Sequence, residues 1–203
     1  MVEFPDAIIE KQGYLDPHIT ILNNNLRLNE PVWDDLRVPV NSVKVPAASY
    51  PDWAAYKGGL VLAFGDQAVE GNEEIVYFTV QMPHNWKTGS NILPHVHWTV
   101  DDTGSGDAVW KLTYSWANIN SVFPTETPDT ITDTFDGTSG KHLITSFNEI
   151  DASGMNLSSM LICSLRRNSS NAADTLTSQD IILLEIDIHY QIDRLGSKYE
   201  ISN

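Results

Sequence analysis

Alternation between apolar and polar side chains is the feature that most restricts how this 203-residue chain can fold. In residues 181–193, the even positions from Ile182 to Ile192 are apolar or aromatic, and the odd positions from Glu185 to Asp193 are polar. Successive side chains of a strand point to opposite faces, so this segment predicts a strand with one buried face and one polar face. No stretch of a dozen residues has the period of an amphipathic helix, and the chain is therefore expected to be all-β.

Short apolar runs separated by turn residues recur along most of the chain. They predict eight or nine strands of ordinary length, at residues 38–45, 60–64, 75–82, 92–100, 109–116, 130–135, 143–150, 160–166 and 181–192. An all-β chain with this many strands is most simply a two-sheet antiparallel β-sandwich, and a jelly-roll-like arrangement fits best.

The same alternation assigns side chains to faces in two further segments. In 109–116 one face is large and apolar, formed by Trp110, Leu112, Tyr114 and Trp116. In 94–100 the apolar side chains are Val96, Trp98 and Val100, and the opposite face carries His95, His97 and Thr99. The aromatic side chains are expected to contribute most to the core.

The first 30 residues have a different character and predict an extended N-terminal arm, with residues 31–203 as the sandwich domain. Three prolines (Pro5, Pro17 and Pro31) and the run 23–25 of three asparagines interrupt any long periodicity. A flexible tail is the alternative interpretation. The first residues lack the charge and apolar block of a secretion signal, and no window reaches the ~18 apolar residues of a membrane span. We therefore expect synthesis in the cytoplasm and no membrane partner.

Charge and cysteine content exclude several classes of function. The chain has 12 lysines and arginines against 27 aspartates and glutamates, a net charge of -15, which argues against a nucleic-acid partner. The single cysteine, Cys163, excludes an intrachain disulfide, and its apolar surroundings predict a buried side chain. Neither a nucleophile elbow nor a phosphate-binding loop is present, so no enzymatic activity and no cofactor are expected. His84, in a loop, is expected to form hydrogen bonds rather than to catalyse.

His95 and His97 are the first candidate site. Residues i and i+2 of a strand project from one face, ~7 Å apart. Cupin-type sandwich enzymes use this spacing to bind a metal, and a glutamate and a third histidine from other strands complete the site. Glu185 and His189 are the predicted further ligands, and Asp187 shares their face. The glutamate that the cupin motif requires after His97 is absent, so a polar sheet surface or subunit interface is the alternative.

Aromatic segments at residues 50–56 and 115–118 are a second candidate site. Stacking on a carbohydrate would require the side chains of Trp53 and Tyr56 to be exposed. Packing of these side chains under a loop is the alternative.

Five strings of residues together resemble a family of virion and hypothetical proteins encoded by tailed bacteriophages and their prophages. The strings are residues 32–40 (VWDDLRVPV), 54–59 (AAYKGG), 77–89 (YFTVQMPHNWKTG), 94–98 (PHVHW) and 110–117 (WKLTYSWA). The resemblance covers about residues 31–193, and the Pro-His-x-His-Trp string is its most specific part. It implies a structural component of a phage particle, in the head, collar, tail or fibre.

The leading hypothesis from the sequence is therefore a bacteriophage virion structural protein that acts by self-association and docking. Its expected location is the virion, assembled in the host cytoplasm. The expected partners are further copies of the chain, in a trimer or ring, and other virion proteins. The two alternatives are a cupin-like metal-binding protein or enzyme, with His95, His97, Glu185 and His189 as ligands, and a carbohydrate- or receptor-binding module that recognises a host glycan.

Overall fold

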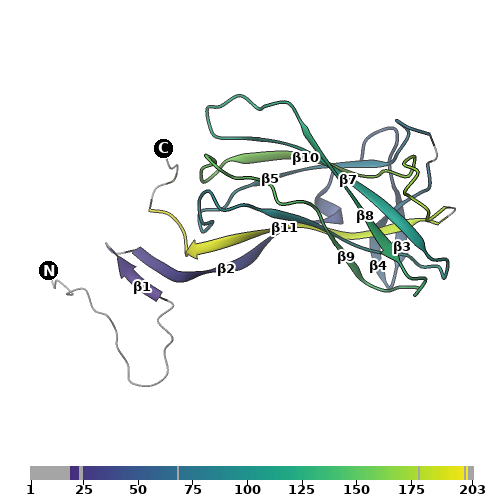
Figure 1. Cartoon of the computed structure of the whole chain (residues 1–203), viewed down its shortest axis with the longest axis horizontal. Helices are drawn as coiled ribbons and strands as arrows, with labels where there is room; N and C mark the ends of the chain where they lie inside the picture. The colour runs from purple at the N-terminus through teal and green to yellow at the C-terminus, as the bar shows by residue number, and fades with distance from the viewer. Residues whose placement is uncertain (1–18, 23–24, 68, 178, 199, 201–203) are drawn as a thin grey trace, which may run out of the picture.

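Eleven strands and one short 3₁₀ helix form the described part of the chain (Figure 1). The structure is a computed structural model that describes residues 19–22, 25–67, 69–177, 179–198 and 200. In chain order the elements are β1 (Ile19–Leu22), β2 (Asn25–Pro39), η1 (Val40–Ser42), β3 (Asp52–Tyr56), β4 (Gly59–Phe64), β5 (Ile75–Gln81), β6 (Leu93–Thr99), β7 (Gly106–Ala117), β8 (Thr127–Phe135), β9 (Leu143–Ser146), β10 (Met160–Arg167) and β11 (Ile181–Arg194).

Strand β11 organises the larger, seven-stranded sheet. One side of β11 pairs first with β4 and then with β2, and its other side pairs with β6. Strands β3, β1 and β9 extend the sheet beyond β4, β2 and β6. The second sheet has the order β5-β10-β7-β8, and every pairing in both sheets is antiparallel. The predicted all-β, jelly-roll-like sandwich is confirmed.

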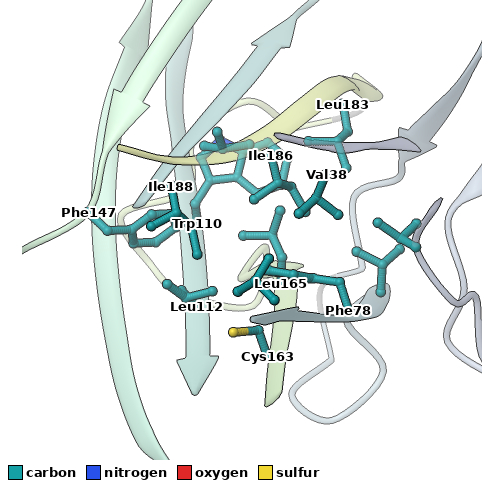
Figure 2. Packing of buried hydrophobic residues seen from close by; sticks show 14 of the residues in the cluster. Val38, Phe78, Trp110, Leu112, Phe147, Cys163, Leu165, Leu183, Ile186 and Ile188 are labelled. Atoms are coloured by element: carbon teal, nitrogen blue, oxygen red, sulfur yellow. The ribbon is translucent and has the colours of Figure 1, made fainter. Parts of the chain in front are cut away.

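The core fills the space between the two sheets. Figure 2 shows Cys163 and Leu165 of β10 on one side of this space and Ile186 and Ile188 of β11 on the other. Each fully buried aliphatic side chain contributes about 1.5–3 kcal/mol of hydrophobic free energy. Cys163 is 3% exposed, which confirms that it is a small core residue.

The tryptophans of the predicted apolar faces lie in this core. Trp98 and Trp110 have no exposed surface, and their ring centroids are 6.3 Å apart. The indole nitrogen of Trp98 donates a hydrogen bond to Thr145, and that of Trp116 donates to Ser159. These partners satisfy polar atoms that would otherwise be costly to bury.

A bulge in β11 changes the predicted faces at the start of that strand. The pairing with β6 shifts between Leu183 and Glu185. A bulge adds one residue to one strand, so the alternation of faces is displaced by one position. As a result Ile181 and Leu183, rather than Ile182 and Leu184, are the fully buried core residues at this end. From Glu185 onward the predicted faces are correct.

Some predicted strand limits were wrong. The first expected strand, 38–45, is mostly not a strand: β2 ends at Pro39, and η1 follows immediately. Strand β3 was missed, because the aromatic segment around Trp53 gave no alternation. Within the described residues there is no α-helix, as expected. None of the helices in these residues is long and apolar enough to cross a membrane.

Strand β2 connects the region predicted as an arm with the sandwich. It runs without interruption from Asn25 to Pro39, across the predicted domain boundary at residue 30. Residues 32–39 pair with β11, while the earlier part pairs with β1 in a hairpin that extends beyond the sandwich (Figure 1). Residues 1–18 of the predicted arm lie outside the described residues.

Candidate functional site

Histidines and carboxylates meet on the outer face of the larger sheet. His95 of β6 lies directly opposite Asp187 of β11, and His189 of β11 lies opposite Asp35 of β2. Residues opposite each other in antiparallel strands share a face and have Cβ atoms ≈ 4.5–5.5 Å apart. The three central strands therefore bring four titratable side chains into one cluster, which we call the His–Asp cluster (Asp35, His95, Asp187 and His189).

Two members of the cluster are buried although they point away from the core. His95 is 4% exposed and Asp187 is 6% exposed. A polar side chain on an outer sheet face would ordinarily be solvated, so the surrounding side chains must cover these two. His189 and Asp35 form the more open side of the cluster, with side chains 30% and 48% exposed.

The polar atoms of the cluster lie close together. Asp187 Oδ1 is 3.5 Å from His95 Nδ1, and Asp187 Oδ2 is 3.6 Å from His189 Nε2. The same nitrogen of His189 is 3.1 Å from Asp35 Oδ1. His95 Nδ1 and Asp187 Oδ1 are both buried and have no hydrogen-bond partner in the structure.

A second layer of side chains supports the cluster. His97 Nε2 is 3.1 Å from Asp187 Oδ2, and the other ring nitrogen of His97 is hydrogen-bonded to His142 at 2.8 Å. These contacts fix the orientation of the Asp187 carboxylate. Burial acts most strongly to raise the pKa of Asp187, but its interactions with the His95 and His97 rings and the charges of His97 and His189 together lower that pKa below its ordinary value.

The structure brings together three of the four predicted ligands: His95, His97 and His189. The fourth, Glu185, lies beside the cluster and forms a two-pronged ion pair with Arg37, with N···O distances of 2.6 and 2.7 Å. Asp187 instead occupies the central position. Sequence reasoning did not select Asp35 or His142 for this site, because their positions depend on strand pairing between distant segments.

A polar cleft of about 400 Å³ lies elsewhere, beside the end of β4. Its polar lining comes from Asp52, Asp66, Gln67, Glu74 and Asp180. Glu74 accepts hydrogen bonds from the backbone of Gly65 at 2.7 Å and from the Gln67 amide at 3.3 Å. Burial is the main reason that the pKa of Glu74 is raised, and the charges of Asp52 and Asp180 raise it further. The cleft therefore offers several oxygen acceptors to a ligand that carries hydroxyl groups.

Exposed aromatic side chains stand close in sequence to Asp52, one of the residues that line this cleft. Tyr50 lies two residues before Asp52, and Trp53 follows it directly. Their side chains are 49% and 47% exposed, so both rings present large surfaces to solvent. Tyr56 is half-buried. The aromatic side chain of segment 115–118, Trp116, is not part of this exposed surface. It packs in the core, and its ring centroid is 6.0 Å from that of Trp86.

His84 lies apart from both sites. One of its ring nitrogens is hydrogen-bonded to Ser197 at 2.6 Å and the other to Ser158 at 3.0 Å. As expected, it is a hydrogen-bonding residue that ties two loops together.

Comparison with known proteins identifies no family. No family model matches the chain, and no curated protein matches it.

Several solved structures have a distantly similar fold. The CBM22-1–GH10 modules of Clostridium thermocellum xylanase 10B are 15% identical (TM-score 0.40), with 79% of this chain and 28% of that chain covered. The CBM22-1 xylan-binding domain of Paenibacillus barcinonensis Xyn10C is also 15% identical (TM-score 0.37), with 79% and 85% covered. The structure of infectious bursal disease virus Gt strain is 11% identical (TM-score 0.39), with 97% and 43% covered. This chain thus spans less than a third of the xylanase chain and less than half of the viral chain, and these similarities assign it no ligand.

Proposed function

We propose that this chain is a non-catalytic carbohydrate-binding protein that binds its ligand in the polar cleft, with the exposed side chains of Tyr50 and Trp53, which lie near the cleft residue Asp52 in the sequence, as a second contact surface. The observation that carries the proposal is the lining of the cleft: four carboxylates and the amide of Gln67, with no lysine or arginine among them. Carboxylate and amide oxygens accept hydrogen bonds from hydroxyl groups, and the amide also donates one. This chemistry suits a neutral sugar and repels an anionic ligand.

The aromatic residues supply the second element of sugar recognition. Trp53 and Tyr50 offer flat apolar surfaces, and one face of a sugar ring is apolar through its C–H groups. Trp53 projects from the face of β3 opposite Asp52, and β3 is one of the edge strands of its sheet. An oligosaccharide longer than the cleft could therefore contact the indole ring around this edge.

A glycan array followed by calorimetric titration of each binding glycan tests the proposal. We expect Trp53→Ala to weaken binding on the order of 10-fold or more, and Glu74→Gln to weaken it as well, because a carboxylate acceptor is replaced by an amide. Trp33→Ala is the matched control, since Trp33 is 54% exposed and lies on β2, outside the cleft. An array without hits, or equal losses for Trp53→Ala and Trp33→Ala, would contradict the proposal.

A virion structural protein is the second candidate function, favoured by the hairpin of β1 and β2. This hairpin extends beyond the sandwich (Figure 1), and Val32 and Trp33 are 48% and 54% exposed on the strand that leads to it. These two side chains lie on opposite faces of the strand, and exposed apolar side chains at the base of a projecting hairpin suit docking on a neighbouring subunit. Such a protein could also bind a host glycan through the cleft.

Light scattering of the full chain, compared with a variant that lacks residues 1–30 and with Trp33→Ala, tests the second candidate. We expect a homo-oligomer whose dissociation constant rises in both variants, and no such change in Trp53→Ala. A full-length chain that stays monomeric at all concentrations would rule out self-association.

A further inference from the structure

We propose that the His–Asp cluster is a binding site for a single zinc ion, with His95, Asp187 and His189 as ligands. This site is independent of the proposed sugar-binding cleft and shares no residue with it. Two buried atoms, His95 Nδ1 and Asp187 Oδ1, face each other at 3.5 Å, which is long for a hydrogen bond, and neither forms a well-made hydrogen bond with any group. Their side chains are only 5% and 8% exposed. A buried polar atom without a well-made hydrogen bond costs up to about 1–3 kcal/mol, and a metal ion between the two atoms would remove this cost for both.

The potential ligand atoms are spaced slightly more widely than the ligands of a tetrahedral ion. Zinc–nitrogen and zinc–oxygen bonds of about 2.0–2.1 Å in tetrahedral geometry place neighbouring ligand atoms about 3.3–3.4 Å apart. Asp187 Oδ1 is 3.5 Å from His95 Nδ1, and the second carboxylate oxygen, Oδ2, is 3.6 Å from His189 Nε2. A single oxygen of Asp187 would therefore face both histidines after a small rotation of the carboxylate. One potential ligand atom from each of the three residues lies within 4.8 Å of the other two. Small side-chain movements therefore suffice to close the site on an ion.

The donor atoms favour zinc over the common alkaline-earth ions. Two imidazole nitrogens and one carboxylate suit zinc or another first-row transition metal, whereas calcium and magnesium prefer oxygen ligands alone. The fourth coordination position faces Asp35, whose carboxylate is 3.1 Å from His189 Nε2. A position on this more exposed side can be filled by the Asp35 carboxylate or by water.

The surrounding residues hold the ligands as outer-shell groups do in metal sites. His97 contacts Asp187 Oδ2 at 3.1 Å, and His142 in turn holds His97. Such outer contacts orient a coordinating carboxylate and increase metal affinity 10–100-fold. The three ligands come from central, paired strands rather than from loops, so the site is rigid. A bound ion would join β6 to β11 and, through Asp35, to β2.

Calorimetric titration of zinc into untagged full-length protein, previously treated with a chelator, tests the proposal. We expect one zinc ion per chain, an increase in Tm with zinc, and a cobalt-substituted form whose visible absorption indicates four-coordinate geometry. Asp187→Asn and His189→Ala should each weaken zinc binding at least 100-fold. His189→Ala is included because its 30% exposed side chain makes it the less disruptive change.

Two matched controls separate this site from non-specific binding. Glu185→Gln removes the neighbouring carboxylate, which pairs with Arg37, and should retain zinc affinity within a few-fold. His84→Gln removes a histidine outside the cluster and should retain it as well. The proposal is wrong if the wild-type chain binds no zinc saturably, or if Asp187→Asn and Glu185→Gln bind zinc equally. The two proposals fail separately. Saturable zinc binding by a protein that binds no glycan would contradict only the proposed function, and glycan binding by a protein that binds no zinc would contradict only the zinc site.

Discussion

At the residue scale, the buried polar groups of this sandwich fall into those that are fully paired and those that are not. Arg167 is completely buried and fully paired: it forms a two-pronged contact with Asp174 at 3.1 and 2.8 Å and donates to the carbonyl oxygens of Leu176 and Gln179. It thereby fixes the loop that leads to β11. Asp187 is hydrogen-bonded to His97 through Oδ2, but its Oδ1 and the Nδ1 of His95 have no such partner. This contrast distinguishes the fully paired Arg167 from the proposed metal site.

Replacement of Arg167 by methionine should lower the free energy of unfolding by about 3–5 kcal/mol, because it leaves the Asp174 carboxylate buried without its partner. Chemical denaturation of both proteins measures the difference. Lys141→Met is the matched control: its ion pair with Asp136 is on the surface, with side chains 46% and 49% exposed, and little change is expected. A similar decrease in the free energy of unfolding for the two variants would show that the burial of the Arg167–Asp174 pair does not determine its contribution to stability.

The thiol of Cys163 should not react in the folded protein. Burial raises its pKa to about 12, so very little thiolate, the reactive form, is present at pH 8. A thiol reagent at pH 8 should label the native protein only at the rate of unfolding and label the guanidinium-denatured protein at once. Rapid labelling without denaturant would contradict the burial of this side chain.

At the scale of elements, β11 determines both the core and the His–Asp cluster. The bulge before Glu185 changes which side chains face inward, and the register with β6 and β2 then sets Asp187 opposite His95 and His189 opposite Asp35. Any shift of one residue in this register would send Asp187 to the core face.

The bulge makes a direct prediction for two adjacent leucines. Leu183→Ala should destabilise the protein by about 2–5 kcal/mol, because it leaves a cavity in the core. Leu184→Ala should cost about 1 kcal/mol or less, because this side chain is only half-buried. Thermal and chemical unfolding of the pair measure both values. The opposite order would mean that the simple alternation from Ile182 continues without a bulge.

The sequence predicted the all-β sandwich and most strand faces because side-chain alternation is a local property. It also predicted that His95, His97 and His189 share a surface. It did not predict the role of Asp187 in place of Glu185, since both residues lie on the polar face of one strand and only the register with β6 distinguishes them. Burial of His95 on that outer face was equally unpredictable, because its ring packs against that of His189, 3.9 Å away between centroids, on a strand distant in sequence.

At the scale of the whole molecule, the large negative charge is expected to limit association between molecules. The net charge of -15 at pH 7 keeps separate molecules apart by repulsion, and the pI of about 4.5 marks where this repulsion vanishes. We expect light scattering to rise as the pH falls towards 4.5, and to fall again in more acidic solution if the fold survives. Equal scattering at pH 7 and pH 4.5 would show that charge does not limit association.

The course of β2 has a mechanical consequence. Its N-terminal part forms the projecting hairpin, whereas residues 32–39 lie antiparallel to β11 in an unbroken register. A pull on the hairpin along the strand axis would load the hydrogen bonds between β2 and β11 in shear, all at the same time, rather than opening them one by one. An attachment made through this hairpin would therefore resist tension far better than one that peels from the sheet edge. Single-molecule stretching along the axis of β2, compared with stretching perpendicular to it, would reveal this difference in unfolding force.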